Sequence, residues 1–233
     1  MNVKKRLWLI ECGSKNWARQ LLARCGLLKI ARSSYAPFRR LLDYRSASKD
    51  GIFYREEELW MCSLFPSDLL KLILSRLHPA SVLDVGCGVG KSLDFFLAHG
   101  VDAYGVEGSK LAISRALHSS RIIEWDLRKE LKLPRKFDLV FSYEVVEHIH
   151  PDHVRQLIRT FINHSDTVVL SAAQPGQKGE GHFNEQPPDY WIALFAEHEY
   201  FLDQEMTSAL QSCGDWFGAN LLALRKAPRA RGS

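Results

Sequence analysis

The segment that most constrains the fold is SVLDVGCGVG at residues 81–90. Its valine and leucine side chains on both sides of Asp84 are typical of a strand buried in a parallel sheet. Three glycines follow at alternate positions: Gly86, Gly88 and Gly90. Glycine adopts positive φ and lets backbone amides approach a ligand closely. The segment therefore predicts a strand that ends in a tight turn, either a nucleotide-binding turn or a plain strand-to-helix turn.

Strand and helix patterns alternate along the rest of the chain. Strands are expected over residues 81–85, 102–107, 121–126, 136–142, 166–173 and 200–202, with a last apolar run at 220–226. Helices are expected over residues 67–77, 91–99, 109–119, 151–162, 188–198 and 204–212. This alternation is typical of βαβ units, which build a parallel sheet covered on both faces. Ligands of such sheets bind at the carboxyl ends of the strands.

Acidic residues fall at those strand ends. Glu107 ends the second expected strand, 23 residues after Asp84, which is about the spacing that places a carboxylate on ribose hydroxyls. Asp126 ends the third, where it could accept a hydrogen bond from the amine of an adenine. The acids strengthen the nucleotide-binding interpretation of the glycine turn.

Four segments in order, VLDVGCGVG, YGVEGS, EWDLR and FDLVFSYEVVEHI, resemble the motifs of class I S-adenosylmethionine-dependent methyltransferases. The resemblance covers about residues 65–226. It implies an α/β fold with a doubly wound, Rossmann-like, seven-stranded and mostly parallel sheet of order 3-2-1-4-5-7-6, whose last strand is antiparallel. It also implies S-adenosyl-L-methionine as the cofactor.

The resemblance further assigns cofactor contacts by position. The glycine turn would surround the methionine part, Glu107 the ribose, Asp126 and Leu127 the adenine, and Tyr143 the sulfonium end. The full expected set is Asp84, Gly86, Cys87, Gly88, Gly90, Glu107, Gly108, Asp126, Leu127 and Tyr143.

Methyl transfer to a hydroxyl needs alignment of donor and acceptor and removal of a proton. The candidate bases are His148, after the fourth expected strand, and His182, which shares the polar loop 174–187 with Glu185. Neutral imidazole near physiological pH suits such a deprotonation. Each histidine also has a structural interpretation: a hydrogen bond at a helix start for His148, and an exposed loop position for His182.

A metal site is the alternative. Glu144, Glu147 and His148 have an ExxEH spacing, and residues three and four apart share a helical face. With His182 as a fourth ligand, they resemble the site of metal-assisted O-methyltransferases acting on quinone precursors or RNA termini. Because the same motif occurs in relatives without metal, the metal stays open.

The favoured function is O-methylation of a small molecule, or of a glycan acceptor that includes lipid-linked sugars. The fourth motif reads SYEV rather than NPPY or DPPY, and no Pro-Cys occurs there, which argues against amino or C5 methylation of nucleic acid. RNA 2′-O-methylation stays an alternative, because ten Lys and Arg among residues 1–42 face a single acid and could neutralise phosphates. A non-catalytic cofactor-binding module is the second class.

Three regions are expected: a basic helical segment with a lid or linker at 1–64, the methyltransferase domain at 65–226, and a disordered tail at 227–233. The basic arm could contact an anionic membrane or serve as a transit peptide. No apolar run is long enough to span a bilayer. The five cysteines form no CxxC pair and suggest reduced thiols in the cytoplasm.

Overall fold

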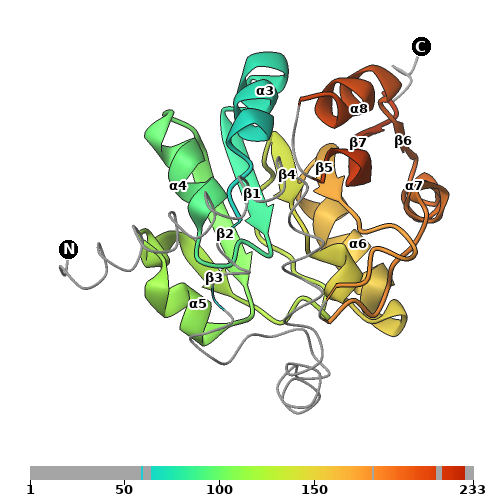
Figure 1. Cartoon of the computed structure of the whole chain (residues 1–233). Coiled ribbons are helices and arrows are strands. Elements are labelled where there is room, and N and C mark those ends of the chain that lie inside the picture. The colour runs from blue at the N-terminus through green and yellow to red at the C-terminus, as the bar shows by residue number, and fades with distance from the viewer. Residues whose placement is uncertain (1–58, 60–63, 180, 214–216, 229–233) are drawn as a thin grey trace, which may run out of the picture.

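A computed structural model describes residues 59, 64–179, 181–213 and 217–228. The expected basic arm lies outside the described residues except for Leu59 and Leu64, as does most of the expected tail. Within the described part, one seven-stranded sheet has the order β3-β2-β1-β4-β5-β7-β6 (Figure 1). The sheet confirms the expected strand order.

The strands are β1 (Ser81–Val85), β2 (Asp102–Glu107), β3 (Ile122–Glu124), β4 (Leu139–Ser142), β5 (Thr167–Ser171), β6 (Tyr200–Leu202) and β7 (Leu221–Lys226). The first five pair in parallel, and β7 runs antiparallel to both β5 and β6. The last strand is therefore antiparallel, as expected.

Helices cover both faces of the sheet (Figure 1). They are α3 (Ser67–Leu77), α4 (Lys91–Ala98), α5 (Lys110–Arg115), α6 (Val154–His164), α7 (Pro188–Ala196) and α8 (Gln204–Gln211). One buried cluster joins the sheet to α3, α4 and α8, and another joins it to α6 and α7. The neighbours Val82 and Leu83 belong to different clusters, because successive strand side chains point to opposite faces. None of the described helices combines the length and the apolar character needed to cross a bilayer.

The third and fourth strands are shorter than their sequence patterns suggest. β3 ends at Glu124 because Asp126 starts a turn, in which its side chain accepts from the Arg128 amide at 3.0 Å and its carbonyl accepts from the Lys129 amide at 2.9 Å. β4 begins only at Leu139, because the Phe137 amide donates to the carbonyl of His164 in α6 instead of to a strand. Asp126 thus lies just after the carboxyl end of β3.

The side chain of His164 links the segment between β3 and β4 to α6 through hydrogen bonds. Its ring is fully buried; Nδ1 donates to the Thr160 carbonyl at 2.6 Å, and Nε2 accepts from the Leu133 amide at 2.9 Å. Burial lowers the pKa of His164 from its usual 6.5, and the charge of Lys136 adds to this effect. The ring is therefore neutral at pH 7, as the Leu133 contact requires.

Replacing His164 with leucine is expected to destabilise the fold by about 1–3 kcal/mol at pH 7.5, because the half-buried Leu133 amide loses its acceptor. The folded pKa lies below the unfolded one, so the stabilisation is complete above pH 6.5 or so and is lost as the pH falls toward the folded pKa. Urea unfolding should therefore show a smaller gap between wild type and variant at pH 5.5 than at pH 7.5. A gap independent of pH would contradict the role given to the ring.

Candidate functional site

The glycine turn after β1 is held against β2. The amides of Gly86 and Cys87 both donate to the Val106 carbonyl, at 2.8 and 3.1 Å. Gly86 has φ +79°, and a Cβ on it would lie 2.4 Å from a methyl group of Val145. A side chain at this position would therefore be strained by the backbone and would clash with the segment after β4.

Glu107, the last residue of β2, organises the same turn. Its carboxylate accepts from the Gly88 amide at 2.8 Å and from the Ser109 amide at 2.7 Å. Burial raises the pKa of Glu107, and hydrogen bonds from the Ser109, Gly88 and Gly108 amides only partly offset this. Ser109 in turn caps α5 by accepting from the Ala112 amide at 3.2 Å. The structure thus brings the turn and the second-strand acid together.

Asp84 adds a second buried acid at this edge of the sheet. It is 3% exposed, and burial, together with a smaller effect of the charge of Glu107, raises its pKa to about 8. Two buried carboxyl groups at the ends of neighbouring strands favour a positively charged ligand, because such a ligand would stabilise their ionised forms.

The carboxylate of Asp126, just after β3, is hydrogen-bonded to a neighbouring side chain. The Asp126 carboxylate accepts from Nε and from a terminal nitrogen of Arg128, each at 2.9 Å, and these hydrogen bonds lower its pKa. Leu127 is half-buried against the core on the α6 side of the sheet. An adenine amine at Asp126 would therefore share the carboxylate with Arg128.

Cys87 and Tyr143 have packing partners in the structure. The Cys87 sulfur lies beside Gly105 of β2, where an added Cβ would come within 2.5 Å of it. The Tyr143 ring stacks on Phe141 with centroids 6.2 Å apart and meets Phe217 edge to face at 6.1 Å. Tyr143 thus follows β4 at the same edge of the sheet as the glycine turn.

A second group of polar side chains joins the segment after β4 to the loop after β5. One potential ligand atom from each of Glu147, His148 and His182 lies within 4.8 Å of the other two. The two imidazole rings are 4.9 Å apart and nearly perpendicular, at 86°. Glu147 and His148 lie on a single 3-10 turn, Val146–His148, and not on the helix that the ExxEH spacing suggested. Glu144 precedes that turn in the left-handed region, with φ +56°.

Hydrogen bonds set the tautomer of each histidine. His148 Nδ1 donates to the Gly181 carbonyl at 3.1 Å, and His182 Nδ1 donates to Glu185 Oε1 at 2.9 Å. Each donation places a proton on Nδ1, so in a neutral ring Nε2 carries the lone pair. Burial and, to a lesser degree, the neighbouring His182 lower the pKa of His148 to about 4. His148 is therefore a neutral ring at pH 7, whose Nε2 can accept a proton or bind a metal.

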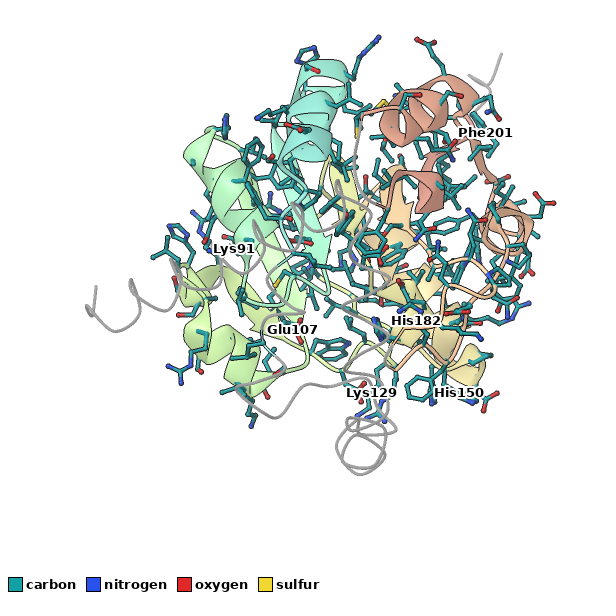
Figure 2. The ribbon with its side chains drawn as sticks, in the orientation of Figure 1. Lys91, Glu107, Lys129, His150, His182 and Phe201 are labelled. Atoms are coloured by element: carbon teal, nitrogen blue, oxygen red, sulfur yellow. The ribbon has the colours of Figure 1, made fainter. Side chains whose placement is uncertain are left out.

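Glu147 supplies a buried acid beside these rings. Both carboxyl oxygens are buried, and the Glu144 side chain and the Ala173 backbone interact with them. Burial raises the pKa of Glu147, and the charge of Glu144 raises it further. One carboxyl group and two imidazole rings, with ligand atoms within 4.8 Å of one another, form a donor set suited to a divalent transition metal. Figure 2 places His182 and Glu107 on the same side of the molecule, away from Phe201 of β6.

Two amide side chains that the sequence did not single out adjoin this group. Asn220 Nδ2 donates to Glu144 Oε1 at 3.5 Å and to Gln177 Oε1 at 3.0 Å, and Gln177 donates back to Asn220 at 2.7 Å. Asn220 is buried just before β7. The loop after β5 is thereby joined to the far end of the chain.

Comparison with known proteins agrees with this fold. A family model described as "Methyltransferase domain" matches residues 55–211. The fold is similar to the sugar N-methyltransferase KedS8 from Streptoalloteichus (17% identity, 69% of this chain and 85% of that chain, TM-score 0.55) and to DesVI from Streptomyces venezuelae (19%, 80% and 95%, 0.56). It is also similar to the 1,6-didemethyltoxoflavin-N1-methyltransferase of Burkholderia thailandensis with bound S-adenosylhomocysteine (17%, 83% and 91%, 0.53). Comparison with curated proteins found no match.

Proposed function

Because the chain belongs to the methyltransferase domain family and is an S-adenosylmethionine-dependent enzyme, we propose that it methylates a hydroxyl group of a small molecule or sugar. The observation that supports this choice is the buried Glu147 carboxyl group beside the imidazole rings of His148 and His182. A hydroxyl acceptor must lose a proton, whereas a neutral amine is already nucleophilic. The acids and imidazoles of this group suit that requirement.

The cofactor would be held at the ends of β1, β2 and β3. In this proposal the glycine turn and Asp84 surround the methionine part, Glu107 accepts from the ribose hydroxyls, and Asp126 with Leu127 faces the adenine. The buried acids fit the two positive charges of S-adenosylmethionine, its sulfonium and its ammonium. When bound, the cofactor supplies an electrophilic methyl group.

The group after β4 would hold the acceptor and remove its proton. Glu147, His148 and His182 would bind a divalent cation, which lowers the pKa of a hydroxyl bound to it. Without a cation, the same step falls to His182, whose Nε2 carries a lone pair while Nδ1 donates to Glu185. The neutral His148 ring and the buried Glu147 beside it favour the cation-assisted form.

Cation removal tests this proposal. With catechol and sugar diols as probe acceptors, treatment with a chelator is expected to reduce methyl transfer about 100-fold or more, and added Mn²⁺ should restore it. The affinity for S-adenosylmethionine, measured by calorimetry, should stay unchanged, since the cofactor residues lie on other strands.

Two results would count against the proposal. Full turnover in excess chelator would overturn the cation-assisted form and leave His182 as the base. Transfer only to the amines in an acceptor panel matched in size and ring structure would overturn O-methylation itself.

A further inference from the structure

We propose that Glu185 is a positioning residue whose carboxylate sets the tautomer of His182 and shapes the loop that presents it to Glu147 and His148. The inference rests on the proposed function of that group, and it adds a residue that touches neither cofactor nor acceptor. The loop in question joins β5 to α7.

Three hydrogen bonds converge on the Glu185 carboxylate. Oε1 accepts from His182 Nδ1 at 2.9 Å, and Oε2 accepts from the Gly176 amide at 2.8 Å. Burial alone would raise the pKa of Glu185, but the hydrogen bonds from His182, Gly176 and Lys178 outweigh it, and the pKa is lowered. The side chains of His182 and Glu185 are only 13% and 17% exposed. Their contact is therefore a shielded one, and it is stronger than an ion pair on the open surface.

The loop adopts a conformation that needs such support. Gly176, Lys178 and Gly181 all have positive φ, of 89°, 52° and 70°. For the non-glycine Lys178 this conformation is unfavourable, because its Cβ crowds the following carbonyl oxygen. By accepting hydrogen bonds from the Gly176 and Lys178 amides, Glu185 offsets this cost and holds that part of the loop near His182.

The chain around His182 is fixed by contacts that do not involve Glu185. The amides of Phe183 and Asn184 donate to the Glu147 carbonyl at 2.9 and 3.0 Å. The His182 ring lies over Gly179, where an added Cβ would come within 1.9 Å of Nε2. These contacts position the His182 ring. Among the described residues, only Glu185 forms a hydrogen bond with its Nδ1.

The tautomer matters because neutral imidazole carries one proton on two nitrogens. With Nδ1–H donated to a carboxylate, Nε2 is an acceptor for a proton or a metal ligand, and its basicity is increased. Without Glu185 the proton can move to Nε2. A protonated Nε2 could neither accept the acceptor's proton nor bind a metal. The carboxylate thus acts through His182.

Nitrogen-15 NMR of the full chain tests the tautomer directly, with the His182 signals assigned by their absence in His182→Ala. Wild type is expected to show His182 protonated on Nδ1, and Glu185→Ala a mixture of the two tautomers. Glu185→Gln should lie between them, because its amide oxygen can still accept from Nδ1. Asp189→Asn, an exposed acid-to-amide change on α7, is the matched control and should leave the spectrum unchanged.

Calorimetry with Mn²⁺ supplies the second measurement. Loss of such a supporting carboxylate is expected to weaken Mn²⁺ binding 10–100-fold in Glu185→Ala, with a smaller loss in Glu185→Gln. A wild-type His182 protonated on Nε2, or an unchanged tautomer in folded Glu185→Ala, would overturn the positioning role. If the tautomers change as expected but wild type binds no Mn²⁺, the cation-assisted function fails while the role of Glu185 stands.

Discussion

His182→Ala is expected to lower turnover by about 10²–10⁴-fold while leaving the affinity for S-adenosylmethionine unchanged. In either form of the proposed mechanism, the variant loses the nitrogen that removes the acceptor proton or helps to hold the cation. The loss should appear in kcat rather than in cofactor binding, because His182 lies in the loop after β5 and the cofactor is expected at β1, β2 and β3.

His150→Ala is the matched control for this variant. His150 lies just after the 3-10 turn that carries His148, but its side chain is 53% exposed and contacts only Asp152 and the neighbouring His153 ring in the described part of the chain. Its replacement should change turnover less than twofold. Wild-type turnover in His182→Ala would remove His182 from the mechanism, and an equal loss in both variants would indicate a general effect of histidine removal.

A double variant separates a shared role from two independent ones. If Glu185 acts only through His182, then His182→Ala combined with Glu185→Ala should be no slower than His182→Ala alone. Additive losses would mean that Glu185 contributes by a separate route. Thermal unfolding of all three proteins checks that the loss of activity does not come from loss of fold.

The sequence predicted the fold well where an apolar run ends at a residue that cannot continue it. The bounds of β1 and β2 are as expected: β1 stops before Gly86, whose φ is +79°, and β2 stops at Glu107, whose carboxylate accepts from the Ser109 amide. The expected extension of β3 to Asp126 was wrong, since a side-chain hydrogen bond to the Arg128 amide competes with the strand there. Such local competition leaves no mark on hydrophobic periodicity.

The candidate site was predictable in its residue types but not in its geometry. The sequence named Glu147, His148 and His182, and the structure brings them together although 34 residues separate the two histidines. It did not foresee the left-handed Glu144 or the amide contact from Asn220, which lies 76 residues further on. The Asn220 contact depends on how β7 returns beside β5, and long-range pairing of that kind is determined by the whole sheet.

Glu107→Ala is expected to weaken binding of S-adenosylmethionine about 100-fold or more. Two hydrogen bonds from ribose hydroxyls to a buried carboxylate contribute about 1.5–3 kcal/mol each, and every 1.4 kcal/mol is tenfold in affinity. The same change removes the acceptor of the Gly88 and Ser109 amides, so the glycine turn also loses its support. Calorimetry measures the affinity, and circular dichroism reports whether the sheet remains folded.

Glu124→Ala is the control, because it removes an acid at the same level of the neighbouring strand without removing a buried carboxylate. Glu124 is the direct partner of Glu107 in the register of β2 and β3, but its side chain is 53% exposed and its described ion pair is with Lys110, which is 81% exposed. Its loss should leave cofactor affinity within about twofold of wild type, because exposed pairs contribute little. Glu107→Gln covers the case in which the alanine variant does not fold, and it should retain part of the affinity through its remaining acceptor oxygen. Wild-type affinity in a folded Glu107 variant would contradict this prediction. It would mean that the support of Glu107 for the glycine turn is not needed for cofactor binding and that another residue binds the ribose.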